Sequence, residues 1–239
     1  MEPLLFFPAE TRQFVDHGFM QAYLSFKPEL EGKRTHFGAL ATIDDGMLKP
    51  GAKGFGIHGH KDAEVVTFMV EGEVNHRDPR VPAHNGTLAA KGLQIISAGT
   101  GILYNEENHS ETNIMRALQI WFTPREPSLP QKYNRRHLEP AEYTNSLQLV
   151  LSPDGRRNSL IVQQDVFMSY SLFTHERRMS YKKHLNANAC YVYLIEGGAT
   201  IEHQTLRKGD GLGVLEKEEF TIETTSSTEL LIIDVPMVT

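Results

Sequence analysis

Two histidines separated by a single residue, His58 and His60, are the side chains whose type and spacing most directly predict chemistry. On a β-strand, residues i and i+2 point to the same face, so both imidazoles can reach one metal ion. A second pair with this spacing, Tyr104 and Glu106, follows a glycine-marked turn at Gly99–Gly101. Two neighbouring strands that each present two inward donors would surround one ion.

His58, His60 and Glu106 supply two imidazoles and one carboxylate. Such a set leaves coordination positions open for water, dioxygen or substrate, as at non-haem iron centres. No thiolate ligand accompanies them, so a closed structural zinc site is not expected. The simpler alternative is that both histidines are ordinary polar residues of a strand and that Glu106 is solvated.

Tyr104 is the least typical donor, because a phenol with a pKa of about 10 is a poor ligand near neutral pH unless the metal lowers that pKa. Three roles stay open: a phenolate ligand, a neutral hydrogen-bond donor beside the site, or a core aromatic. Glu64 lies at even spacing from both histidines, and an intervening turn favours a supporting hydrogen-bond role over direct ligation. His76 and His109 lie near the same turns and are candidate pocket walls.

The remaining histidines have no partner at ligand spacing and are expected to be surface or hydrogen-bonded polar residues. They are His17, His36, His84, His137, His175, His184 and His203.

The elements that must position these residues are short apolar segments bounded by turn residues, which predict strands. In the first half they lie at 37–43, 65–70, 73–78, 93–97 and 116–122, and in the second half at 147–151, 160–166, 168–173, 189–195, 199–203 and 229–235. Asp44-Asp45-Gly46 predicts a turn that closes the first of them. No segment has a long helical period, so the predicted fold class is all-β, a barrel or sandwich.

A change in composition between residues 124 and 140 predicts an ordered linker. Four prolines fall there among mostly polar residues: Pro124, Pro127, Pro130 and Pro140. Proline fixes φ and lacks a backbone N–H, so such a segment resists regular structure. We therefore expect an N-terminal domain at 1–123 and a C-terminal domain at 141–239.

The second half resembles the first. The segment 193–197, which ends in Glu-Gly, parallels 68–72, and Lys-Gly at 208–209 parallels 91–92. Counting from these glycines, the places of the four candidate ligands are taken by Lys183, Leu185, Thr221 and Glu223. We therefore expect one equipped site per chain, in the N-terminal half.

Composition limits the possible partners and surroundings. The chain has 239 residues and a formal net charge of -6, with no basic patch that would predict nucleic-acid or membrane-surface binding. Its only cysteine, Cys190, lies in an apolar strand and is expected to be buried, and no internal disulfide is possible. With no signal-like or membrane-spanning segment, the expected location is the cytoplasm.

The segment 37–78 resembles the pirin family of the cupin superfamily. The resemblance is carried by Asp44-Asp45-Gly46, Pro50-Gly51, Gly54-Phe55-Gly56, His58-Gly59-His60, Glu64, Glu71-Gly72 and His76-Arg77-Asp78, and it continues through Ser97-Ala98-Gly99-Thr100-Gly101-Ile102 to about Trp121. It implies a bicupin, in which two cupin barrels of jelly-roll type follow one another in the chain.

The resemblance also implies a metal site. Position by position, the metal ligands of the family fall on His58, His60, Tyr104 and Glu106. The family usually has histidine where this chain has Tyr104, so one neutral imidazole donor is missing. The implied cofactor is one divalent ion, first of all iron(II), with nickel, copper, manganese and zinc as alternatives.

Two kinds of role follow from the resemblance. One is a quercetin 2,3-dioxygenase-type reaction, which opens the ring of a flavonol with release of carbon monoxide. Glu106 would be ligand or proton acceptor, and Phe55 and Phe68 would be pocket walls. The other is a metal-dependent binding module without turnover, such as a transcriptional co-regulator that docks a regulatory protein.

Overall fold

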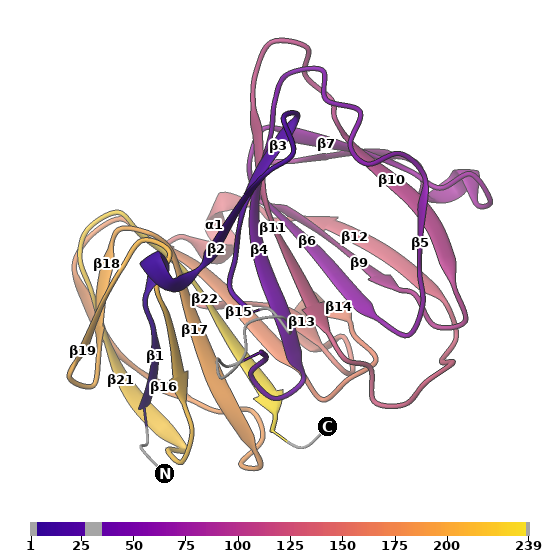
Figure 1. Ribbon diagram of the computed structural model, residues 1–239. Helices are drawn as coiled ribbons and strands as arrows, with labels where there is room; N and C mark the ends of the chain where they lie inside the picture. The colour runs from indigo at the N-terminus through magenta and orange to yellow at the C-terminus, as the bar shows by residue number, and fades with distance from the viewer. Residues whose placement is uncertain (1–3, 27–34, 238–239) are drawn as a thin grey trace.

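The computed structural model describes residues 4–26 and 35–237, and it is built almost entirely of β-strands. Two similar halves lie side by side in the molecule (Figure 1). Each half combines a seven-stranded sheet with a four-stranded sheet. The predicted all-β fold and its internal repeat are therefore confirmed.

In the N-terminal half, the large sheet has the order β12-β9-β6-β11-β4-β3-β2 and the small sheet the order β5-β10-β7-β8. The large-sheet strands are β2 (Gln13–Asp16), β3 (Met20–Leu24), β4 (Leu40–Leu48), β6 (Glu64–Glu71), β9 (Gly92–Ser97), β11 (Met115–Phe122) and β12 (Lys132–His137). The small-sheet strands are β5 (His58–His60), β7 (Glu73–Arg77), β8 (Gly86–Ala89) and β10 (Ile102–Asn108).

The C-terminal half repeats this plan with the orders β1-β20-β17-β22-β15-β13-β14 and β16-β21-β18-β19. Its large-sheet strands are β1 (Leu4–Phe7), β13 (Gln148–Ser152), β14 (Leu160–Ile161), β15 (Phe167–Phe173), β17 (Asn188–Glu196), β20 (Gly211–Val214) and β22 (Thr228–Pro236). Its small-sheet strands are β16 (Arg177–Lys182), β18 (Gly198–Ile201), β19 (Gln204–Arg207) and β21 (Glu219–Thr224).

Helical structure among the described residues is confined to single turns. These are η1 (Ala9–Thr11), η2 (Pro82–His84), η3 (Arg156–Asn158) and α1 (Pro140–Tyr143). None of the helices in the described ranges is long and apolar enough to cross a bilayer.

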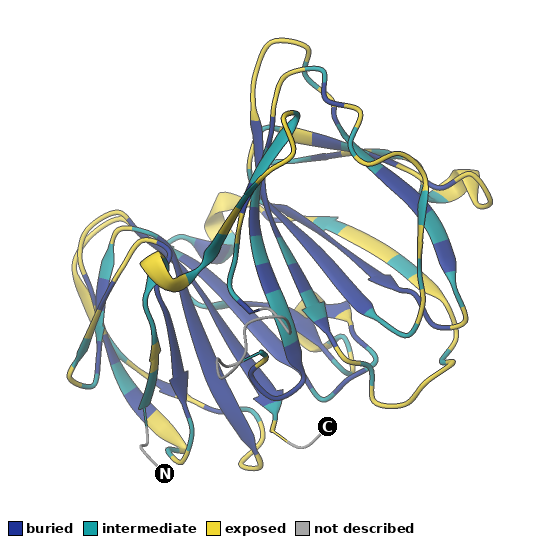
Figure 2. Ribbon diagram, viewed as in Figure 1, coloured by how far each residue is buried: buried dark blue, intermediate teal, exposed yellow. Residues whose placement is uncertain are grey.

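A shared hydrophobic core joins the two halves through their large sheets. Phe68 of β6 and Tyr170 of β15 are completely buried, with ring centroids 4.7 Å apart. Figure 2 shows the strands between the two lobes as mostly buried. Because side chains alternate along a strand, each large sheet presents one face to this shared core and the other to the interior of its own half.

The turn predicted at Asp44-Asp45-Gly46 is wrong, because β4 runs straight through it. Asp45 is buried and accepts two hydrogen bonds from Arg116 on the adjacent β11, both at 2.8 Å. A buried partner thus satisfies a side chain that would otherwise favour a turn. The strand predicted at 160–166 is also shorter than expected, since only Leu160–Ile161 pairs.

Two segments pair with strands that lie outside the domain limits expected from the sequence. The proline-rich segment 124–140 contains β12, which pairs with β9 of the N-terminal half along its whole length. The first described strand, β1, pairs with β20 of the C-terminal half. The shared core and these strands position the N-terminal interior, where the candidate site lies.

Candidate functional site

The two halves differ in how their interiors are filled. Inside the C-terminal half, one continuous cluster of buried apolar side chains fills the space between the sheets. Inside the N-terminal half there are two smaller apolar clusters and a cavity of about 350 Å³. This volume lies within the range of small-molecule sites.

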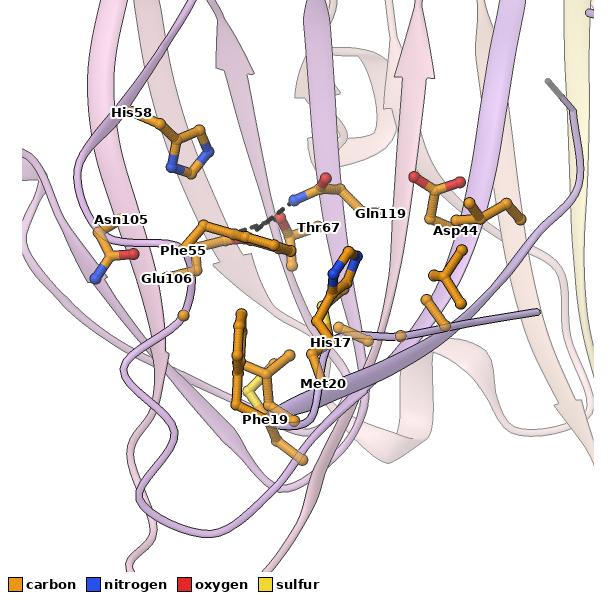
Figure 3. Close-up of a pocket in the computed structure, with 18 residues that line it drawn as sticks. His17, Phe19, Met20, Asp44, Phe55, His58, Thr67, Asn105, Glu106 and Gln119 are labelled. Carbon is orange, nitrogen blue, oxygen red and sulfur yellow. Dashed lines mark hydrogen bonds between the residues drawn. The ribbon is translucent and has the colours of Figure 1, made fainter. Parts of the chain in front are cut away.

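The cavity is largely apolar, with a few polar groups (Figure 3). Its lining residues are Val15, His17, Phe19, Met20, Ala22, Leu24, Asp44, Gly46, Leu48, Gly54, Phe55, His58, Thr67, Asn105, Glu106, Met115, Ala117 and Gln119. Phe19 and Phe55 meet edge to face with ring centroids 5.1 Å apart. Such a cavity suits a flat aromatic molecule with a few polar substituents.

Glu106 of β10 is the carboxylate of the cavity wall that lies closest in sequence to Tyr104. Its carboxylate accepts hydrogen bonds from Thr67 (2.8 Å), Gln94 (2.6 Å) and Gln119 (3.1 Å). Burial raises the pKa of Glu106, although these donors and the nearby His58 oppose the rise. The three donors fix the orientation of the carboxylate, as expected for a side chain that supports a ligand or a proton transfer.

The position of the His58 hydrogen is fixed by a backbone carbonyl. Its Nδ1 lies 2.8 Å from the carbonyl oxygen of Gly56. Because a carbonyl only accepts, Nδ1 carries the hydrogen, so in the neutral imidazole the lone pair is on Nε2. His60, two residues on, has its ring 4.9 Å from that of His58 and 4.6 Å from that of Trp121. Burial, and then the proximity of His58, lower the pKa of His60, which favours the neutral imidazole.

Tyr104 lies between these histidines and is almost fully buried. It pairs directly with His58 across β10 and β5, and its ring centroid is 5.0 Å from that of His58 and 5.3 Å from that of His60. Its hydroxyl is buried without a hydrogen-bond partner, which typically costs about 1–3 kcal/mol. Burial and the charge of Glu106 raise its pKa well above the usual value.

The donor types in this region suit a divalent cation, since they are neutral imidazoles and oxygen atoms. Within residues 4–26 and 35–237, no group of three His, Cys, Asp or Glu side chains could hold a metal ion. The side chains that do lie together are His58, His60 and Tyr104. The cluster fits a cation when the unpartnered Tyr104 hydroxyl is counted as a donor.

Several expected site residues lie elsewhere. Phe68 faces the core shared between the halves, so its prediction as a pocket wall is wrong. Glu64 is buried outside the cavity and accepts hydrogen bonds from Ser97 (2.7 Å) and the backbone N–H of Gln163 (3.1 Å). His109 is exposed and does not line the cavity. Even spacing along β6 places 64 and 68 on the face opposite to Thr67.

His76 lies behind the site rather than in the cavity wall. Its ring is fully buried and stacks between Tyr104 and Tyr133, with centroids 5.4 and 4.8 Å apart. Burial lowers its pKa to about 4 against the opposing charge of Asp78, so the imidazole is neutral at physiological pH. Its Nε2, like the Tyr104 hydroxyl, is buried without a hydrogen-bond partner among the described residues.

The sequence interpretation missed several residues that line the cavity or hold Glu106 in place. His17 is exposed, as expected of a surface residue, but it also lines the cavity, with its ring centroid 5.3 Å from that of Phe55. Thr67, Gln94 and Gln119 were not singled out. Each is a polar residue inside an otherwise apolar strand, and that is the signal that could have identified them, because buried polar groups need partners.

Strand register corrects the assignment of equivalent positions in the C-terminal half. His58 pairs with Tyr104 and Glu106 with His76, while Tyr181 pairs with Phe220 and Ile222 with Ile201. His76 and Ile201 each stand four residues after the Glu-Gly turn, so the registers match. The four candidate ligands therefore correspond to Tyr181, Lys183, Phe220 and Ile222. These positions differ by one or two residues from those obtained by counting from the repeated glycines. Three of the four belong to the apolar filling, so the C-terminal half lacks the donor set.

Comparison with known proteins matches both halves. A family model described as Pirin matches residues 9–122, and one described as Quercetinase C-terminal cupin domain matches residues 149–235. The chain is 32% identical over 233 residues to a quercetin 2,3-dioxygenase of Escherichia coli, covering 96% of this chain and 97% of the relative.

Solved structures agree with the sequence matches. A crystal structure of the bacterial pirin YhhW from Escherichia coli, in complex with nickel(II), has a TM-score of 0.90 and 30% identity, covering 98% of this chain and all of the other. A quercetin 2,3-dioxygenase from Acinetobacter baumannii shares the fold, with a TM-score of 0.73 at 17% identity. With a cupin-type domain in each half and a relative matched over nearly its whole length, the chain belongs to the pirin family.

Proposed function

We propose that this protein is a metal-dependent dioxygenase that opens the ring of a flavonol such as quercetin in its N-terminal cavity. The observation that carries the proposal is the cavity itself, an apolar space of about 350 Å³ that has Glu106 and His58 in its wall. The quercetin 2,3-dioxygenase relative and the nickel complex of the similar pirin support it. We place the protein in the cytoplasm, which suits a chain whose single cysteine is a buried free thiol.

His58 and His60 would hold the ion, and Glu106 in the cavity wall would be the proton acceptor. A divalent ion bound there would act as a Lewis acid and lower the pKa of the substrate hydroxyl. Iron(II) is the first candidate, and nickel, copper, manganese and zinc are the others.

The remaining steps belong to residues of the chain. Phe19 and Phe55 pack against the flat rings of the substrate and exclude water from the reacting carbon atoms. Glu106 accepts the hydroxyl proton, and its raised pKa brings it closer to that of the phenol it deprotonates. Thr67 and Gln119 hold the carboxylate in place. In the overall reaction both oxygen atoms of dioxygen enter the products and one ring carbon leaves as carbon monoxide.

The test uses untagged protein, because a histidine tag would bind metal itself. The metal content is measured first, and the apo protein is then loaded separately with each of the five metals. Quercetin absorbance and carbon monoxide release are followed with and without dioxygen. We expect oxygen-dependent loss of quercetin and carbon monoxide release with at least one metal. Lack of turnover with every loaded metal would contradict the proposal.

A second candidate function is metal-dependent binding of a small aromatic molecule or a regulatory protein, without turnover. It is favoured by Tyr104, which stands where the family usually has a histidine, and by the lack of a three-member His, Cys, Asp or Glu group in the described ranges. Quercetin that quenches the fluorescence of Trp121 but is not consumed in air would support this function over the enzyme.

A further inference from the structure

The hydroxyl of Tyr104 is the least explained polar group of the site. It is buried, and no hydrogen-bond partner is present for it in the described part of the chain. A buried hydroxyl in this state destabilises the fold, because folding strips its water without replacing the lost hydrogen bonds. If the ring only filled space, phenylalanine would stabilise the fold more than tyrosine at this position.

The C-terminal half provides an internal control for this argument. The position equivalent to Tyr104 is Phe220, which pairs with Tyr181 as Tyr104 pairs with His58. Phe220 is buried in the apolar filling and needs no hydroxyl. The same strand position can thus be filled by an aromatic ring without oxygen, so the hydroxyl of Tyr104 calls for a separate explanation.

The Tyr104 hydroxyl lies on a ring that is surrounded by other potential metal ligands. His58 lies directly opposite on β5, with its Nε2 lone pair left free by the Nδ1 hydrogen bond. His60 follows on the same face, and the ring centroids of both histidines lie within 5.3 Å of that of Tyr104. Three potential metal ligands, from the paired strands β5 and β10, therefore lie close together.

We propose that the phenol oxygen of Tyr104 is a metal ligand, together with His58 and His60. The inference rests on the proposed function, because it concerns the ion of that same site. When the ion binds, the O–H bond of the phenol breaks, the oxygen forms a bond to the metal and the proton passes to solvent. No change of oxidation state is involved. An anionic oxygen in place of a neutral nitrogen shifts the preference of the site toward harder ions of higher charge.

Copper(II) is the probe for this bond, because it binds imidazole and oxygen donors strongly and a copper–phenolate bond gives a visible charge-transfer band. The untagged apo protein is titrated alongside three variants: Tyr104→Phe, Tyr104→His and Tyr143→Phe. Tyr143 is a buried tyrosine of α1 that packs against Tyr170 in the shared core, and it serves as the matched control.

We expect the band in the wild type and in Tyr143→Phe. Tyr104→Phe should fold, as Phe220 in the other half indicates, and its thermal unfolding checks this. It should lose the band and bind copper at least about 10-fold more weakly, whereas Tyr104→His should bind copper without the band.

A Tyr104→Phe protein with the copper affinity and spectrum of the wild type would overturn the inference. It would favour a buried water between Tyr104 and the unpartnered Nε2 of His76. If that variant also consumes quercetin, the proposed function stands while the inference fails. If neither the wild type nor Tyr104→His consumes quercetin with any of the five metals, the proposed function is contradicted. A copper–phenolate band lost in Tyr104→Phe would still support ligation by Tyr104.

Discussion

At the scale of single residues, Glu106 is the group on which the proposed chemistry depends most. Replacing Glu106 with glutamine keeps its size and removes the negative charge and the proton acceptor. We expect quercetin consumption by the metal-loaded variant to fall by about 10²-fold or more. Steady-state rates for Glu106→Gln and wild type, at equal metal content, check this. Glu107→Gln is the control, because Glu107 does not line the cavity.

Spacing made part of the site predictable. The i, i+2 rule identified two pairs, and the structure brings His58, His60 and Tyr104 together. The same rule could not tell which face of a two-faced sheet is the cavity, because both faces of the large sheet are buried. That is why Phe68 was expected in the pocket but lies in the shared core.

At the scale of elements, β1 contributes to a half of the molecule from which it is distant in sequence. Phe7 at its end meets Tyr191 of β17 edge to face, with ring centroids 5.4 Å apart. We expect Phe7→Ala to lower the free energy of unfolding by about 3 kcal/mol. Urea unfolding measures this. Phe14→Ala in β2 is the control, and since Phe14 is 48% exposed its effect should be much smaller. Equal effects would show that β1 does not anchor the C-terminal sheet.

Strand identity was predictable where apolar runs are long, as in β6, β11 and β22. It failed where a distant partner decides. Asp45 looks like a turn residue in the sequence, and only the bidentate contact with Arg116, 71 residues away, keeps it in a strand. The pairing of β12 with β9 likewise depends on the neighbouring sheet edge and not on local composition.

At the scale of the whole molecule, Arg116 connects the two halves. It donates two hydrogen bonds to Asp45 in the N-terminal half and one to Glu196 in the C-terminal half, at 2.7 Å. We expect Arg116→Ala to destabilise the protein by about 3 kcal/mol, because the buried Asp45 then loses both hydrogen bonds from its closer counter-charge and keeps only the ion pair with Arg12 at 3.6 Å. Arg178→Ala is the control, since the Arg178 ion pair with Glu223 is exposed and should contribute less than about 1 kcal/mol.

The same cluster predicts a dependence of stability on pH. Burial opposes ionisation of Asp45, but the hydrogen bonds and charge of Arg116, with the charge of Arg12, outweigh it and lower the pKa of Asp45. A folded-state pKa below the unfolded value stabilises the fold at neutral pH, and this stabilisation is lost as pH falls below about 4. Urea unfolding at pH 7 and at pH 3 measures the loss. In Asp45→Asn the loss should be smaller, and an unchanged pH dependence would exclude this pair as its source.

The location of the ion tests the account most directly. Crystals of the untagged protein grown with copper(II) or iron would show it by anomalous diffraction. We predict an ion within about 2.2 Å of His58 Nε2 and of the Tyr104 hydroxyl oxygen, between β5 and β10. An enzyme that consumes quercetin but holds its metal elsewhere, with no ion bound to His58, would contradict the account.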